Sequence, residues 1–204
     1  MKDGSLVITA RPEPGRFEGY DYTSGRVRQK GAGFAYGAYV TRARLPKGKH
    51  MWPAFWLFNA TSDCKYEEID ILEYRGQEAS VVHHAAHWGR NWSHIVSKDA
   101  APNLPFDMSE GFHEYALLWR RQSLEFYVDD IKYTTMSLDP DEWRKGYNDP
   151  CGSEILPFTE RSNFIINTAV GGNFFIDYPP LTLEEAQGWP KATFEIDWVR
   201  IYQE

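Results

Sequence analysis

The sequence predicts an all-β domain built as a sandwich of two antiparallel sheets. Short runs rich in β-branched and aromatic residues recur along the chain, and turn-forming residues separate them. Some runs alternate between polar and apolar residues, whereas others are apolar on both sides, and two packed sheets explain both patterns. The expected strands cover residues 6–10, 36–45, 54–58, 68–73, 115–119, 124–128, 164–170 and 193–202.

The segments between these strands carry turn signals or polar insertions. Pro46-Lys47-Gly48-Lys49, Asp129-Asp130 and Gly171-Gly172-Asn173 are typical turns. One helix is expected, over residues 182–187, where Thr182 caps a first turn that carries two glutamates. Residues 139–157, rich in Pro, Gly and charge, form a long loop, which suits either a binding role or a disordered excursion.

Length and charge limit the classes of protein to consider. With 204 residues, of which 42% are hydrophobic, the chain predicts a single domain over residues 1–204. Its net charge of −7 argues against nucleic-acid binding, which needs a clustered basic surface. No apolar run is long enough to span a membrane. We expect a monomer that is secreted, although the chain carries no signal peptide.

Cysteines and aromatic residues leave alternatives open. Cys64 and Cys151 are the only cysteines and lack metal-ligand spacing, so a disulfide between them stays an open question. Aromatic residues make up 16% of the chain, including 8 Trp and 12 Tyr. This surplus suits either stacking on sugars or a β-rich core, and composition does not decide between the two.

The most informative segment is Glu68-Ile69-Asp70-Ile71-Leu72-Glu73, which places three carboxylates among aliphatic residues. Acids in such a setting need partners or shared protons, so the run is a candidate functional site. On a regular strand Glu68 and Asp70 share a face, but Glu73 points the opposite way. A β-bulge near Ile71 or Leu72 returns Glu73 to the face of Glu68 and sends the aliphatic side chains to the core.

The bulge also predicts a reaction type. It leaves the Glu68 and Glu73 backbones about 13 Å apart, so side chains that lean inward approach the ~5–5.5 Å carboxyl spacing of a retaining glycosidase. The chain holds its own comparison in Glu195-Ile196-Asp197, which starts alike but continues without a third acid. We interpret that copy as an ordinary strand, so Glu-Ile-Asp alone is a weak signal.

The strand from Glu68 to Glu73 resembles the signature of glycoside hydrolase family 16 in its bulged form. Matching segments follow one another in the family's order along nearly the whole chain. They are residues 22–27, 45–48, 51–57, 115–119, 167–173 and 197–202.

This resemblance implies a β-jelly-roll whose concave sheet forms an open substrate cleft. It implies that Glu68 is the nucleophile, that Glu73 is the acid and base, and that Asp70 tunes the nucleophile. The segment Trp52-Pro53-Ala54-Phe55-Trp56 is similar to that of laminarinases, which favours a β-1,3-glucan substrate, with mixed-linkage glucan second. No cofactor is expected for this chemistry.

Further residues match positions that contact substrate in the family. Trp52 and Trp56 share a strand face only if the strand runs regularly through Pro53, so spacing alone leaves open that one is a sugar platform and the other core. The resemblance places both near the substrate. Trp119, on a strand that the resemblance pairs with the catalytic strand, is a third candidate. For each indole, packing in the core is the alternative.

Three polar residues complete the predicted substrate-binding set. His87 lies on the strand after the catalytic one, where an imidazole reaches the central Asp70 or a sugar hydroxyl. A metal site at the nearby histidines is rejected because His84 points away from His83 and His87 on a strand. Arg42 and Asn167 match cleft-facing positions, and a structural hydrogen bond is the alternative for each.

The sequence also departs from the family pattern. The family's leading strand is absent, and that strand helps to complete a structural calcium site. The remaining ligands implied by the resemblance are the Gly4 carbonyl and Asp197, so we expect little dependence on calcium. Residues 83–84 and 90–92 are unlike a typical laminarinase and keep a marine galactan, met by Arg75 and Arg90, as the alternative substrate. A non-catalytic glucan-binding protein ranks below both, because all three acids are present.

Overall fold

The protein is a sandwich of two six-stranded antiparallel sheets, described by a computed structural model over residues 4–62, 65–143 and 157–203. The first sheet has the order β1 (Leu6–Thr9), β14 (Thr193–Tyr202), β5 (Gly37–Arg44), β10 (His113–Trp119), β11 (Ser123–Val128) and β12 (Ile131–Ser137). The second has the order β4 (Arg26–Arg28), β13 (Asn163–Val170), β6 (Met51–Ser62), β7 (Lys65–Tyr74), β8 (Val82–Gly89) and β9 (Ile95–Ala100).

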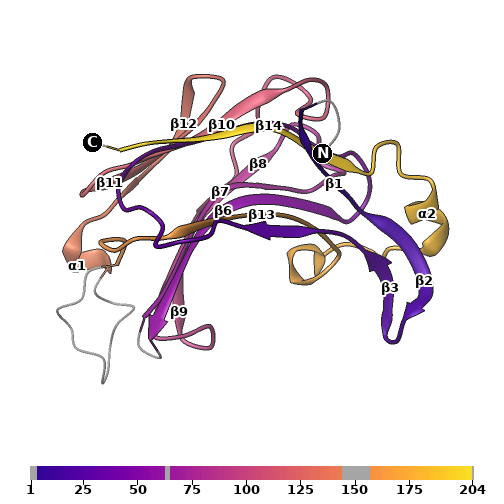
Figure 1. Ribbon diagram of the computed structural model, residues 1–204, viewed down its shortest axis with the longest axis horizontal. Coiled ribbons are helices and arrows are strands. Elements are labelled where there is room, and N and C mark those ends of the chain that lie inside the picture. Colours follow the sequence, from indigo (N-terminus) through magenta and orange to yellow (C-terminus); the bar gives the residue numbers. More distant parts are fainter. Residues whose placement is uncertain (1–3, 63–64, 144–156, 204) are drawn as a thin grey trace.

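Smaller elements flank the sandwich. In Figure 1 the two sheets lie one above the other, and the strands of the lower sheet bend toward β9. A separate hairpin pairs β2 (Arg11–Phe17) with β3 (Tyr20–Thr23). The helices are short: α1 (Pro140–Trp143), the 3-10 turn η2 (Asn173–Phe175) and α2 (Leu183–Gln187). No helix within the described residues has the length and hydropathy to cross a membrane.

The sequence-based expectations of fold are confirmed. Each of the eight expected strands coincides with an observed strand, and two packed antiparallel sheets are present. Helix α2 begins as predicted, because the Thr182 side chain accepts from the backbone N–H of Glu185, whose carboxylate accepts in return from the N–H of Thr182. Cys64, Cys151 and most of the expected loop after residue 139 lie outside the described residues.

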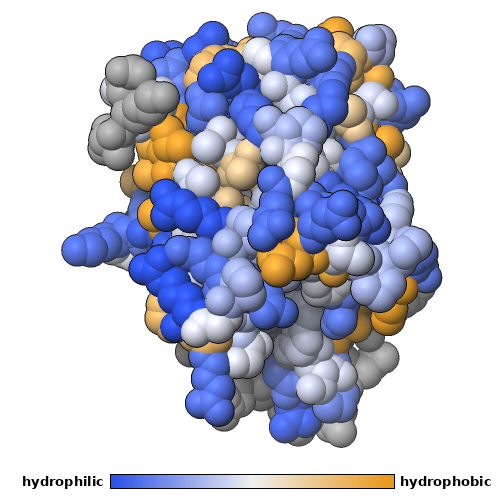
Figure 2. Space-filling model, turned by 90° about the vertical axis from the view of Figure 1, so that its right-hand side faces the viewer, coloured by the Kyte–Doolittle hydropathy of each residue, from blue (hydrophilic) through white to orange (hydrophobic). Residues whose placement is uncertain are grey.

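The core fills the space between the sheets. From β6 and β7 it receives Phe55, Leu57, Ile69 and Leu72, and the facing strands of the first sheet contribute side chains such as Phe126, all fully buried or nearly so. The face of the molecule in Figure 2 is mainly hydrophilic, with hydrophobic patches that are separate from one another. Large apolar side chains therefore concentrate inside the sandwich.

A bulge interrupts β7 where the sequence predicted it. In the pairing with β8, Asp70 is opposite Ala85 and Glu73 is opposite His83, so Ile71 and Leu72 together face the single residue His84. Both Ile71 and Leu72 are fully buried and belong to the hydrophobic core, which the bulge allows for two successive residues on one side of the strand. The bulge therefore places Glu73 on the same outer face as Glu68.

His84 stabilises this bulge from the neighbouring strand. Its buried imidazole Nδ1 lies 2.9 Å from the carbonyl oxygen of Ile71, and its ring stacks on Phe126 with centroids 4.7 Å apart. Burial lowers the pKa of His84 to about 4, so at neutral pH the ring is neutral and Nδ1 donates its hydrogen to the carbonyl. This contact satisfies a buried acceptor at the irregular point of the strand.

His84→Leu is expected to destabilise the protein and to impair catalysis together. Losing the donor leaves the Ile71 carbonyl buried without this partner, which should cost about 1–3 kcal/mol in the free energy of unfolding measured with urea. Loosening the bulge should also lower kcat/KM. Phe126→Leu, which disturbs the same stack but no hydrogen bond, should lower stability alone. Equal activity losses in the two variants would contradict the role of the hydrogen bond.

Candidate active site

A cleft of about 290 Å³ lies on the outer face of the second sheet, and the three acids of β7 line it. Glu68 and Glu73 are partly exposed there, whereas Asp70 is buried between them. The other lining residues are Arg26, Trp52, Ala54, Trp56, Tyr66, Trp92, Asn167 and Ala169. The structure thus brings the predicted carboxylates together in one concave, aromatic-rich site.

Glu67 shows that position on the strand decides which acids reach the cleft. Glu67 directly precedes Glu68 on the strand, so its side chain points to the opposite face. Its buried carboxylate accepts a hydrogen bond of 2.9 Å from the backbone N–H of Phe158. The Lys65 ammonium lies 3.4 Å from the same carboxylate. Burial raises the pKa of Glu67. This fourth acid of β7 anchors a loop inside the sandwich and is separate from the catalytic group.

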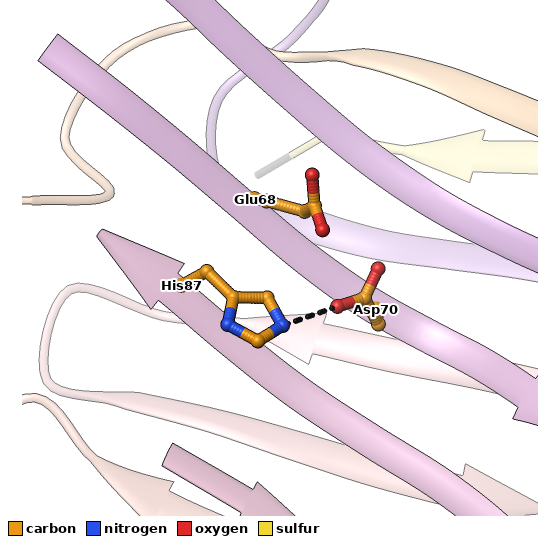
Figure 3. A group of neighbouring side chains, drawn as sticks. All are labelled: Glu68, Asp70 and His87. Carbon is orange, nitrogen blue, oxygen red and sulfur yellow. Dashed lines mark ion pairs between the residues drawn. The ribbon is translucent and has the colours of Figure 1, made fainter. Parts of the chain in front are cut away.

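The central acid, Asp70, contacts a histidine on the neighbouring strand. His87 on β8 points toward Asp70, with 3.2 Å between the His87 Nε2 and the Asp70 Oδ2 (Figure 3). The other imidazole nitrogen, Nδ1, lies 2.6 Å from the hydroxyl of Ser97 on β9. Burial and the neighbouring Glu68 raise the pKa of Asp70 well above its usual value. The predicted contact between His87 and the central acid is therefore present.

Glu68 is held by a tyrosine two residues earlier on the same strand. The Tyr66 hydroxyl donates a hydrogen bond of 2.6 Å to the Glu68 carboxylate. Burial raises the pKa of Glu68, and the Tyr66 hydrogen bond, His87 and Arg26 oppose that rise. Three groups thus favour the ionised form, which is the form that a nucleophile requires.

Glu73 has an environment that favours the protonated form. Burial raises its pKa well above the usual value, and the charges of Asp70 and Glu68 add to the rise. A 2.7 Å hydrogen bond from the Trp52 indole N–H and the charge of His87 lower this pKa. Since their surroundings treat Glu68 and Glu73 differently, Glu68 is suited to attack and Glu73 to proton donation.

Glu68, Asp70 and His87 are also the group of described residues whose side-chain donor atoms could hold a metal ion. Those atoms all lie within 4.8 Å of one another. Each already has a protein partner, because Glu68 accepts from Tyr66 and His87 contacts Asp70.

Trp52 and Trp56 both line the cleft. The pairing of β6 with β13 runs without a break from Met51 to Phe58, so the strand is regular through Pro53 and the two indoles share a face. Both indoles therefore lie in the cleft, as the resemblance implied, and neither is a core residue. One ring face of Trp52 is covered by Phe174, with centroids 4.7 Å apart, which limits its use as an open platform.

Asn167 lies beside Trp56 in the cleft, as expected. Its side-chain oxygen accepts a 2.7 Å hydrogen bond from the Trp56 indole N–H, and the Arg26 guanidinium lies 4.8 Å from the centroid of the same indole. Asn167 therefore orients Trp56, which leaves one indole face to the arginine. This pair of contacts fixes the edge of the cleft next to β4.

Trp119 and Arg42 do not belong to the cleft, so these two predictions are wrong. Strand β10 pairs with β5 and β11, not with the catalytic strand, and Trp119 is fully buried with its indole N–H donating to the Phe158 carbonyl. Arg42 lies on β5 of the same sheet and forms an ion pair of 2.5 Å with Asp197. Both residues are structural because their strands form the opposite layer of the sandwich.

Gly4 and Asp197 lie together at the edge of the sandwich, far from the acids in sequence and in sheet order. Both line a second cavity of about 340 Å³ between the strand edges, which is lined mostly by apolar residues. The Asp197 carboxylate is already neutralised by Arg42. These residues by themselves do not supply the six or more oxygen ligands that calcium takes, and weak dependence on calcium stays a prediction.

Besides two alanines, the residues of the cleft that the sequence reasoning missed are Arg26, Tyr66 and Trp92. A signal existed for Tyr66, since it is two residues from Glu68 and shares its strand face. Trp92 is 64% exposed, and only the surplus of tryptophan in the composition hinted at it. Arg26 reaches the cleft from β4, whose pairing with β13 is not visible in the local sequence.

Comparison with known proteins agrees with this geometry. Residues 2–155 match the family model described as glycosyl hydrolases family 16. The chain belongs to this family. A glucan endo-1,3-beta-glucosidase of Cryptopygus antarcticus is 38% identical over 98% of this chain and 75% of its own length. A beta-glucanase of Rhodothermus marinus is 32% identical over 98% of the chain and 68% of its own length.

Solved structures of the family have the same fold. The catalytic domain of an endo-1,3-beta-glucanase (laminarinase) from Thermotoga petrophila RKU-1 superposes with a TM-score of 0.77. It is 32% identical in sequence, and the match covers 100% of this chain and 79% of that one. The expected jelly-roll sandwich is thereby confirmed, as is the resemblance to the family.

Tyr66→Phe is expected to move the acidic limb of the pH profile of kcat/KM to higher pH. The hydroxyl stabilises the ionised Glu68 carboxylate, so its removal raises the pKa of that carboxyl. A higher pH is then needed to form the ionised nucleophile. Tyr127→Phe is a matched control, because Tyr127 donates in the same way to Glu125 on the other sheet. An acidic limb that stays in place would contradict the assignment.

Trp52→Phe is expected to move the basic limb of the same profile to higher pH. The indole N–H favours the ionised form of Glu73, and without it the carboxyl holds its proton further into the alkaline range. Trp56→Phe provides the comparison, since the indole there donates to Asn167 and not to a catalytic acid. A basic limb that moved to lower pH in Trp52→Phe would show that Glu73 is not the group reporting this limb.

Proposed function

We propose that this protein is a retaining endo-β-1,3-glucanase that cleaves laminarin-type glucan by double displacement. The observation that carries this proposal is the placement of Glu68 and Glu73 on one cleft face in contrasting environments. Ionised Glu68 attacks the anomeric carbon while Glu73 protonates the leaving oxygen. Glu73 then accepts a proton from the water that releases the sugar.

Asp70 and His87 support this cycle without touching the sugar bond directly. Asp70 is buried beside the nucleophile, and its raised pKa favours a neutral carboxyl that can donate a hydrogen bond. His87 holds Asp70 from the next strand. All acid, base and nucleophile roles are filled by side chains, so we propose that catalysis needs no cofactor.

The relatives named above act on glucans, and the charges of the cleft favour a neutral sugar. Three acids line the site, and Arg26 is the cation among its lining residues. Arg75, expected to meet sulfate in a galactan, instead donates from Nε to the Phe174 carbonyl and lies over the Phe174 ring. A sulfated galactan is therefore the less favoured substrate. A secreted location and a monomeric state stay predictions.

Profiling the products from a panel of polysaccharides tests the substrate. Laminarin should yield short oligosaccharides, lichenan should yield fewer, and agarose, porphyran and carrageenan should yield none. Release from a galactan alone would overturn the glucanase proposal. No release from any polysaccharide, with oligosaccharide binding retained, would instead favour a binding protein.

Azide rescue tests the two glutamates, because they do different work in double displacement. Glu73→Ala should still form the glycosyl-enzyme from an activated aryl glycoside, and azide, which needs no base, should release it as the β-glycosyl azide. Glu68→Ala cannot form that intermediate, so any azide product should be the α-anomer. The opposite anomers from the two variants would mean that the roles are exchanged.

A further inference from the structure

Trp92 occupies an exposed position at the rim of the catalytic cleft. It lies in the turn between β8 and β9, and its side chain is 64% exposed. It nevertheless lines the same cavity as Glu68 and Asp70. A large indole that is open to solvent beside catalytic acids is unlike the other tryptophans of the cleft, Trp52 and Trp56, which are partly buried.

The turn that carries Trp92 is tightly closed by hydrogen bonds. The Asn91 side chain accepts from the backbone N–H of Ser93 at 3.1 Å, and the Asn91 carbonyl accepts from the N–H of His94 at 2.8 Å. Gly89 has φ 152, and a Cβ there would lie 2.2 Å from the His94 carbonyl oxygen. Only glycine fits at this position, so the backbone that carries Trp92 has a defined conformation before any ligand binds.

Trp92 also continues a row of aromatic rings that leads to the nucleophile. Its ring centroid lies 5.7 Å from that of Tyr66, and Tyr66 lies 5.4 Å from Phe58. Phe58 in turn contacts Trp56 at 5.7 Å. Because the Tyr66 hydroxyl donates to Glu68, the row passes beside the nucleophile at Tyr66, and Trp92 lies one ring further out.

We propose that Trp92, supported by Tyr66, forms an additional subsite that stacks on a neutral β-1,3-linked glucosyl unit outside the catalytic position. This inference rests on the proposed function and adds a binding residue that the resemblance does not supply. A glucosyl ring offers an apolar C–H face to an indole, and the indole carries no charge that would select a sulfated sugar. Stacking on an exposed ring binds the substrate without a part in proton transfer, so it mainly affects KM.

The experiment measures affinity as a function of chain length in the inactive Glu68→Gln background. Calorimetric titration with laminaribiose through laminarihexaose would compare this parent with added Trp92→Ala, Trp92→Phe or Tyr202→Ala. Tyr202 is a matched control, because it is 54% exposed and lies on β14 of the opposite sheet. In the parent, affinity should rise sharply at the chain length that first reaches Trp92, by about 5- to 150-fold by analogy with base stacking. Trp92→Ala should abolish this step in affinity.

Shorter oligosaccharides that do not reach the rim should bind the parent and Trp92→Ala alike, and Trp92→Phe should keep part of the step. Equal affinities of parent and Trp92→Ala at every length would overturn the subsite while leaving glucanase activity intact. An equal loss at every length, laminaribiose included, would also overturn it, since Trp92 would then act through Tyr66. If the wild-type protein fails to cleave laminarin but the Trp92 step persists, the proposed function fails and the subsite stands.

Discussion

The bulge at Ile71 and Leu72 is the constraint on which the catalytic site depends. A regular strand would place Glu73 in the core, because strand side chains alternate between faces. With the extra residue, both aliphatic side chains are buried and both glutamates reach the cleft. His84 opposes the bulge on β8 and hydrogen-bonds the Ile71 carbonyl, so a core histidine helps to fix a surface site.

The electrostatic difference between the two glutamates comes from their neighbours, since both are subject to burial. Burial raises the pKa of each, and the neighbouring acids add to the effect at Glu73, whereas Tyr66, His87 and Arg26 counter it at Glu68. Ionised acids that are crowded together lower the stability of the fold. The strand that carries them also packs Ile69, Ile71 and Leu72 in the core, and this packing opposes that cost. The hydrogen bonds from Tyr66 and Trp52 then adjust each carboxyl individually.

Local sequence was sufficient for features that depend on one strand. The spacing of Glu68, Asp70 and Glu73 predicted the bulge, and the capping pattern at Thr182 predicted helix α2. The sequence reasoning missed β2, β3, β4, β9 and β12. Strand β2 holds two prolines and a glycine, which disfavour a strand, whereas β12 is rich in β-branched residues and was open to prediction.

The positions of the remaining site residues depend on which strands are neighbours in a sheet, and this pairing could not be predicted from local sequence. Trp119 and Arg42 sit on strands of the opposite sheet, and a resemblance of short segments does not fix which strands are neighbours. Trp92 and Arg26 reach the cleft from a turn and a short edge strand that no local pattern links to the acids. A site residue is thus predictable where strand periodicity alone orients it, and unpredictable where sheet order decides its position.

Proton NMR of the anomer first released by the wild-type enzyme from a laminari-oligosaccharide tests the central claim most directly. If the bulge brings Glu68 and Glu73 close enough for double displacement, the β-anomer appears first and the α-anomer follows only by mutarotation. An α-anomer as the first product would contradict the account, because inversion needs carboxyl groups about 6.5–9.5 Å apart with a water between them.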